Sequence, residues 1–191
     1  MKPPLFKPAG SGGQQTDRMH FSLGKPFRKE CTMFPYKKIL VAVDGSPISD
    51  LALDEAIQLA RETGAELELI HVVDELVYLN GFESATCYME DVLPLMQAEG
   101  EKVLEAGRIK AAAQGVTARS CLKMSGAGRM CDLVAEQAQT CQADLLVLGS
   151  HGRRGIRRWL LGSDAEQILR ISPVPVLLVR APAEEIKTAA G

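Results

Sequence analysis

No hydrophobic run in this 191-residue sequence is long enough to cross a bilayer. Its apolar stretches, such as Ile39 to Val43, have the length of a strand, well short of the ~18 residues that a membrane-spanning helix requires. The sequence also lacks an apolar segment near its start of the kind found in secretory signals. A transmembrane protein is therefore excluded, and we expect no membrane partner.

Cysteine and histidine are scarce, and their spacing matches no metal site. The five cysteines form no Cys-x-x-Cys pair, and the three histidines are His20, His71 and His151. A zinc site would need these residue types at short, repeated spacings. An odd number of unpaired cysteines favours buried, reduced thiols over a disulfide framework. We therefore expect a reducing, cytoplasmic location, and the sequence assigns no metal ligand.

Neither sign of charge dominates the chain. Its 22 basic and 24 acidic side chains give a net charge of −2. Residues 1–35 hold six of the basic and two of the acidic side chains, so the remaining residues carry a net charge of −6. A mildly acidic body argues against a nucleic-acid-binding face over the whole domain, and no nucleic-acid partner is expected. The content of 46% hydrophobic and 24% charged residues is that of a folded globular domain.

Residues 1–34 differ in composition from the rest of the chain. They are rich in proline, glycine and basic residues and show no sustained hydrophobic period. This composition predicts a flexible basic N-terminal arm over residues 1–34, and a frayed tail is expected over residues 181–191. Two alternatives for the arm stay open: an organelle transit peptide, and a start codon assigned too early, with Met33 the true first residue.

Deleting residues 1–34 is expected to leave the thermal stability of the domain almost unchanged. A segment without periodic apolar positions cannot bury enough surface to dock on a core. Thermal unfolding of the full-length and shortened chains measures the effect. A melting temperature lower by many degrees after the deletion would contradict the prediction, because it would mean that the arm packs against the domain.

Strands and helices alternate between residues 35 and 180. Apolar and β-branched runs predict strands buried on both faces at 39–43, 67–73, 117–124, 145–148 and 174–179. Helical periods predict helices at 47–63, about 90–114 with an interruption at Pro94, about 129–139, and 163–171. Ser46 can cap the first of these helices. This order predicts an α/β fold, with a single open five-stranded parallel sheet and helices on both faces, Rossmann-like in its architecture.

The loop after the fourth strand has the residues that an anion site needs. It reads Gly-Ser-His-Gly from Gly149 to Gly152, continues through an arginine-rich stretch, and ends at Gly162 and Ser163, where the next helix begins. Glycines let backbone N–H groups converge on an anion, and the start of a helix adds further amides and its dipole. Parallel sheets bind ligands beyond the carboxyl ends of their strands. The sequence therefore favours phosphate binding at this loop, with Asp44 nearby at the end of the first strand.

Neither the GxxxxGK[ST] phosphate loop nor the GxGxxG dinucleotide fingerprint occurs in the chain. The spacing Gly149-x2-Gly152-x9-Gly162-Ser163 resembles instead the complete G-x2-G-x9-G-[S/T] motif of the ATP-binding universal stress proteins. The resemblance also includes Lys38-Ile-Leu-Val-Ala-Val-Asp44-Gly-Ser46, His71-Val-Val-Asp74 and Pro173-Val-Pro-Val-Leu-Leu-Val-Arg180. It implies a universal stress protein domain over residues 35–180, a sheet of the adenine-nucleotide-binding type, and ATP, with Mg or Mn, as the ligand.

The resemblance implies a role for each matching position. The loop glycines and serines match a cradle for the triphosphate, and Asp44 matches the acidic residue that faces the nucleoside. Ala42 and Val72 match positions that flank the adenine. The expected nucleotide-binding residues are Ala42, Asp44, Ser46, Val72, Gly149, Ser150, His151, Gly152, Arg153, Gly162, Ser163 and Asp164. Asp44 holding a divalent ion is an open alternative, and no residue is expected to be catalytic.

Three functions stay open from the sequence. The resemblance favours an ATP-binding regulatory or stress-response protein. A slow Mg- or Mn-dependent ATPase and an ATP-gated interaction module with an unknown protein partner are the alternatives. For His151, phosphate contact is favoured over a role as general base, because its spacing suggests no carboxylate partner. The strand segment Val176–Val179 should lie at the sheet edge, and we expect a homodimer formed through it.

Overall fold

The computed structural model describes residues 36–75, 92–126, 128–152 and 161–180. The strands in these residues are β1 (Lys38–Ala42), β2 (Glu66–Val73), β3 (Ala118–Met124), β4 (Leu145–Gly149) and β5 (Val176–Val179). The helices are α1 (Pro47–Thr63), α4 (Leu93–Ala113), α5 (Met130–Thr140) and α6 (Ser163–Ile171). None of these helices combines the length and apolar character needed to cross a membrane.

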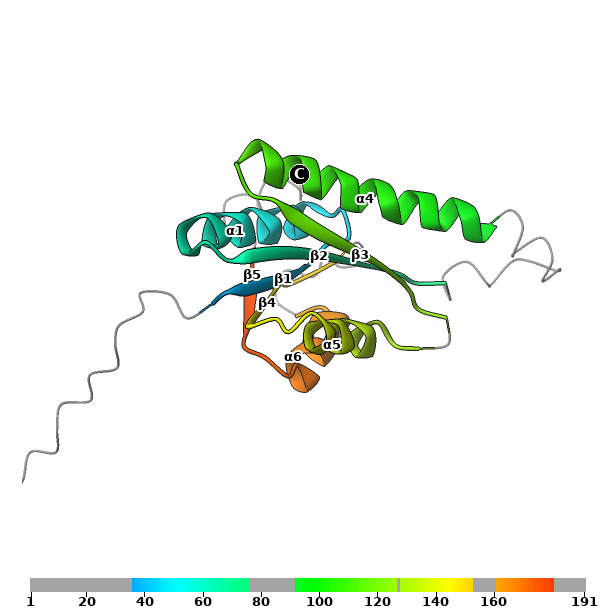
Figure 1. The fold of residues 1–191 in the computed structure, drawn as a ribbon. Helices are drawn as coiled ribbons and strands as arrows, with labels where there is room; N and C mark the ends of the chain where they lie inside the picture. The colour runs from blue at the N-terminus through cyan, green and yellow to red at the C-terminus, as the bar shows by residue number, and fades with distance from the viewer. Residues whose placement is uncertain (1–35, 76–91, 127, 153–160, 181–191) are drawn as a thin grey trace, which may run out of the picture. The chain divides into compact units, whose positions relative to one another are not determined.

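The five strands form one parallel sheet in the order β3-β2-β1-β4-β5 (Figure 1). The predicted fold class, an open five-stranded parallel sheet, is confirmed. From β1 the chain adds β2 and β3 on one side and then β4 and β5 on the other. The strand order therefore reverses between β1 and β4, and the carboxyl ends of these two strands flank the point where such sheets bind ligands.

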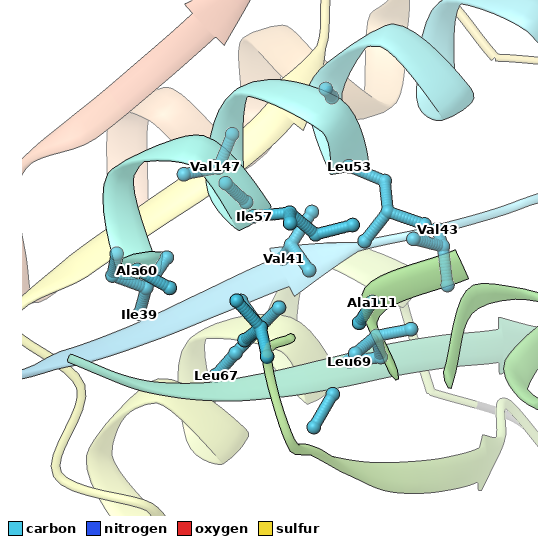
Figure 2. Packing of buried hydrophobic residues seen from close by; sticks show 14 of the residues in the cluster. Ile39, Val41, Val43, Leu53, Ile57, Ala60, Leu67, Leu69, Ala111 and Val147 are labelled. Carbon is cyan, nitrogen blue, oxygen red and sulfur yellow. The ribbon is translucent and has the colours of Figure 1, made fainter. Parts of the chain in front are cut away.

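Two hydrophobic layers cover the sheet, one on each face. Helices α1 and α4 lie on one face, and α5 and α6 lie on the other (Figure 1). On the first face, Ile57 and Leu53 of α1 pack with Val41 and Val147 of the sheet (Figure 2). The second face has its own cluster, centred on Leu40, Ile70, Leu146, Val134 and Ile168. Successive residues of one strand serve opposite layers because strand side chains alternate between faces.

Helix α4 lies close to β2 at two glycines. A Cβ atom added at Gly100 would lie 2.6 Å from Cδ1 of Leu122 and 3.1 Å from Cδ2 of His71. One added at Gly107 would overlap Cδ2 of Leu69 and lie 3.3 Å from Cδ2 of Leu53. These contacts are closer than packed side chains tolerate, so the two glycines set the distance between α4 and the sheet.

Proline explains two differences between the predicted and the observed elements. Helix α4 runs without a break from Leu93 to Ala113, so Pro94 lies in its first turn instead of interrupting it, while the predicted start near residue 90 lies outside the described residues. The N–H groups of the first helical turn make no hydrogen bond within the helix, so proline, which lacks an N–H group, is tolerated there. Strand β5 begins at Val176 instead of residue 174. Pro173 and Pro175 cannot donate to a ladder, although the Pro175 carbonyl accepts a hydrogen bond from the Leu146 amide at 3.0 Å.

Candidate functional site

A cavity of about 600 Å³ opens at the carboxyl edge of the sheet, within the size range of small-molecule sites. Strands β1, β2 and β4 contribute their ends to it, α4 contributes from one layer, and α5 and α6 contribute from the other. Nine of the twelve residues expected from the sequence line it: Ala42, Asp44, Val72, Gly149, His151, Gly152, Gly162, Ser163 and Asp164. The fold therefore brings together residues that lie far apart in the sequence.

One side of the cavity is apolar. This apolar compartment is formed by strand residues and by one face each of α5 and α6, namely Ala42, Ile70, Val72, Leu148, Met130, Val134, Ala165 and Ile168. Ala42 is the smallest of the strand side chains and leaves space above the sheet. The compartment suits a flat, uncharged group that is excluded from water.

Asp44 lies where β1 turns into α1, and its carboxylate is held by the turn. Its Oδ1 accepts a hydrogen bond from the Ser46 amide at 2.9 Å, and its own amide donates to Oγ of Ser49 at 2.9 Å. Ser46 is buried and caps α1, with its Oγ accepting from the Ser49 amide at 3.2 Å. Ser46, expected as a ligand residue, thus lies outside the cavity lining, and its hydroxyl fixes the turn that orients Asp44.

Gly152 lies against this carboxylate. A Cβ atom added at Gly152 would lie 2.7 Å from Oδ2 of Asp44. The absence of a side chain therefore lets the loop after β4 approach the turn after β1. Gly149 has a different reason to be glycine, since a Cβ there would lie 2.8 Å from Cγ2 of Ile48 in α1. Gly152 keeps the cavity open, whereas Gly149 accommodates the packing of α1.

The start of α6 presents amide groups next to the same loop. Helix α6 begins at Ser163 after Gly162, and no side chain caps it. Its first N–H groups have no partner within the helix, and with the helix dipole they favour an anion. The Gly162 amide donates to the Ser150 carbonyl at 2.9 Å, which ties the helix start to the loop. Asp164 is exposed, so its backbone N–H can face the cavity while its carboxylate stays in solvent.

Ser150 and His151 make a hydrogen bond to each other within the loop. Oγ of Ser150 lies 3.0 Å from Nδ1 of His151. Ser150 is buried and, unlike His151, does not line the cavity. The Ser150 amide donates to the Val179 carbonyl at 2.7 Å, which anchors the loop to β5. The expected contact of Ser150 with phosphate stays a prediction, and in the structure its hydroxyl lies against His151.

Helix α4 and His71 contribute to the cavity in a way that the sequence reasoning missed. His71 is buried in β2, and its Nδ1 lies 2.6 Å from the Val43 carbonyl oxygen. Because that oxygen can only accept, Nδ1 carries the hydrogen. Met96 and Gly100 of α4 also line the cavity. The sequence signal was weak, since the stretch before α4 shows no period and His71 reads as one residue of a buried strand.

Arg153 and possible metal ligands are the remaining charged groups that the sequence raised for this site. Arg153 lies outside the described residues, so its expected place in the site stays a prediction. In the part of the chain that the structure describes, no group of three or more histidine, cysteine, aspartate or glutamate side chains could hold a metal ion.

Comparison with known proteins gives a consistent family. Residues 35–180 match the model of the universal stress protein family. The chain is 34% identical over 150 residues to the universal stress protein YxiE of Bacillus subtilis, covering 76% of this chain and 99% of that protein. The solved universal stress protein UspA from Lactobacillus plantarum matches with a TM-score of 0.64 and 23% identity, over 76% of this chain and 98% of that one. A universal stress protein solved in complex with cAMP matches with a TM-score of 0.56 and 27% identity, over 76% and 97%.

Proposed function

Because this chain belongs to the universal stress protein family, we propose that it binds an adenine nucleotide, principally ATP, and acts as a nucleotide-dependent regulatory protein of the stress response. The observation that carries the proposal is the joining of two kinds of wall in one cavity. The lining combines an apolar compartment with an amide-rich loop and helix start. A base and a phosphate chain need this combination.

The nucleotide is proposed to lie with its adenine in the apolar compartment. Ala42 leaves room for the ring, and the backbone of Val72 at the end of β2 is within the cavity lining. The Asp44 carboxylate is proposed to accept hydrogen bonds from the ribose hydroxyls, because a carboxylate beside phosphates would repel them. The related structure that holds cAMP, at 27% identity, supports an adenine ring as the ligand's base.

The phosphates are proposed to lie between the Gly149–Gly152 loop and the first turn of α6. Backbone N–H groups at Gly152, Ser163 and Asp164 would supply donors at no cost in side-chain entropy. Two donor groups, one at each end of the motif, suit a chain of phosphates better than a single phosphate. Mg²⁺ or Mn²⁺ would accompany ATP as part of the ligand, held mainly by the phosphate oxygens.

Equilibrium binding of ATP to the full-length chain tests the proposal. Calorimetric titrations with ATP, with and without Mg²⁺, are expected to give saturable binding, with adenosine and cAMP binding more weakly and GTP weaker still. Phosphate release during single-turnover incubation is measured in parallel, so that a slow ATPase would be detected. The absence of ATP binding at millimolar nucleotide would overturn the proposed function.

We further propose a homodimer formed through β5. This strand lies at the edge of the sheet and pairs with β4 on its inner side. Its four residues, Val176 to Val179, are apolar yet only half-buried. An apolar edge strand with free backbone groups is an aggregation hazard, which pairing with a two-fold copy removes.

Lysine substitutions in β5 are expected to separate the dimer contact from the subunit core. Leu177 packs on the α1 side of the sheet, whereas Leu178 packs on the opposite face. Because α1 already covers the face of Leu177, we expect Leu178→Lys to give monomers and Leu177→Lys to lower the melting temperature of each subunit. Sedimentation of the three proteins measures their oligomeric state, and thermal unfolding measures their melting temperatures. A monomeric unmutated protein at tens of micromolar would contradict the prediction.

A reducing location, the cytoplasm, is also part of the proposal. Cys121, Cys131 and Cys141 are free thiols, and the last two are buried. Burial raises the pKa of the Cys121 and Cys141 thiols, and the nearby negative charge of Glu68 adds to the effect. A raised pKa keeps a thiol protonated and poorly reactive. These thiols therefore fit a packing role in a compartment where cysteines stay reduced.

A further inference from the structure

Ser150 and His151 form a pair that nucleotide binding alone does not explain. Ser150 is 3% exposed, and its Oγ lies 3.0 Å from Nδ1 of His151. His151 lines the cavity, and its Nε2 is buried with no hydrogen-bond partner among the described residues. We propose that Ser150 holds neutral His151 in the Nε2–H tautomer, so that His151 donates a hydrogen bond to a phosphate oxygen of the nucleotide and takes no proton from water.

The tautomer follows from comparing how many buried polar groups stay unpaired in each of the two possible hydrogen-bond directions. If the Ser150 hydroxyl donates to Nδ1, its hydrogen is used and the imidazole carries its own hydrogen on Nε2. If Nδ1 donates instead, the hydroxyl hydrogen lacks an acceptor and Nε2 keeps an unused lone pair. The first arrangement leaves one buried group without a partner, and the second leaves two. Since unpaired buried polar groups are unfavourable, the first arrangement is the more stable.

The position of Ser150 is fixed by its backbone. Its amide donates to the Val179 carbonyl at 2.7 Å, and its carbonyl accepts from the Gly162 amide at 2.9 Å. The backbone of Ser150 is therefore held between β5 and the start of α6, and its Oγ lies beside Nδ1 of His151. Ser150 is a positioning residue in this account, because it acts on the ligand only through His151.

The remaining Nε2–H group is a donor that needs an acceptor. Phosphate oxygens are the acceptors that the proposed ligand brings to this end of the cavity, so this step rests on the proposed function. Nε2 has no exposed area in the present conformation, so the ring or the loop must shift slightly to reach a phosphate. The unpaired donor favours that shift, because contact with an anionic oxygen satisfies it.

The same tautomer removes His151 as a general base. A nitrogen that already carries a hydrogen cannot accept a proton from an attacking water molecule. The other ring nitrogen is occupied by the Ser150 hydroxyl. The pair therefore suits a site that retains ATP intact, and any hydrolysis at this site would need a base other than His151.

The tautomer is measured directly by NMR of the full-length, ¹⁵N-labelled chain at a pH where imidazole is neutral. His71 serves as an internal reference, because its Nδ1 faces the Val43 carbonyl and must carry hydrogen. We expect His151 to give the opposite pattern, with hydrogen on Nε2. Ser150→Ala should mix the two forms of His151, and Ser150→Thr, which restores a hydroxyl, should bring back the single form. Hydrogen on Nδ1 of His151 in the unmutated protein would overturn the proposal.

Two amide substitutions test the donor by its position. Glutamine at residue 151 can place an N–H where Nε2 lies, whereas asparagine, one methylene shorter, places it nearer Nδ1. We expect His151→Gln to bind ATP within about threefold of the unmutated protein and His151→Asn to lose roughly tenfold to a hundredfold. Adenosine, which has no phosphate, should bind both variants equally.

The outcomes separate this inference from the proposed function. Equal ATP affinity of the two variants would overturn the role of Nε2, while ATP binding by the unmutated protein would leave the proposed function standing. A protein that binds no ATP at all would overturn the proposed function, and the NMR measurement would still decide the tautomer. Phosphate release that is lost in His151→Gln while binding persists would show Nε2 acting as a base, which contradicts the proposal.

Discussion

Gly152→Val is expected to abolish ATP binding while leaving the fold intact. Gly152 is not among the described residues with positive φ, so a side chain brings no backbone strain. Its Cβ, however, would lie 2.7 Å from Oδ2 of Asp44, and the two further methyl groups would project where the phosphates are proposed to pass. Loss of two charge-assisted hydrogen bonds, at about 1.5–3 kcal/mol each, corresponds to a loss of affinity of about a hundredfold or more.

Calorimetric titration with ATP measures this effect, and thermal unfolding checks the fold. Ala112→Val is the control, because Ala112 is an exposed residue of α4 and lies outside the cavity lining. Gly152→Ala, which adds the Cβ alone, should give an intermediate loss by displacing the Asp44 carboxylate. If Gly152→Val binds ATP as tightly as the control, the close approach of this loop to the phosphates is wrong.

Gly107→Val is expected to lower the free energy of unfolding by about 2–3 kcal/mol, because overfilling a packed core forces its neighbours out of their rotamers. The new Cβ would overlap Cδ2 of Leu69, a side chain that is 0% exposed. Leu69 cannot move away without displacing Leu53 or other members of the same cluster. For a chain of this size the change corresponds to a fall of roughly 5–10 °C in the melting temperature.

The matched control is Ala106→Val, one residue earlier on the exposed side of α4. It introduces the same β-branched side chain into the same helix without meeting the core. Because valine is a poorer helix former than alanine and a better one than glycine, helix propensity alone would make Ala106→Val the less stable of the two variants. Gly107 does not line the cavity at the carboxyl edge of the sheet, and ATP affinity should be retained below the melting temperature. Equal melting temperatures of the two variants would mean that α4 can move away from β2 at little cost.

Local sequence signals were sufficient to locate the five strands, apart from the start of β5, and to predict the turn after β1 and the start of α6. The run from Ile39 to Val43 is apolar at every position because the strand is buried on both faces, and Ser46 followed by proline sets the start of α1. Gly162 and Ser163 mark the start of α6 by the same local chemistry. Each of these features depends on neighbours in the sequence, so it can be predicted without the fold.

The parts of the site that depend on contacts between distant elements could not be predicted. The contribution of Met96 and Gly100 arises because α4 packs across β2, and no local pattern encodes that contact. Gly149 lines the cavity, but the reason that a side chain is excluded there is Ile48 of α1, 101 positions earlier. The hydrogen bonds of Ser150 to Val179 and His151 likewise join residues that no local pattern links.

The cavity takes its walls from helices on both faces of the sheet, α4 on one and α5 and α6 on the other. A ligand bound there would contact helices of both layers. Either layer could then separate from the sheet only by losing its contacts with the ligand. Each layer would open independently without the ligand, as cooperative units of a domain do. With the ligand bound, opening of either layer would also cost the ligand contacts that the two layers share. The free energy of unfolding of the domain would rise by the binding free energy. A rise and fall in nucleotide concentration would then set how stiff the entire molecule is, including faces far from the cavity.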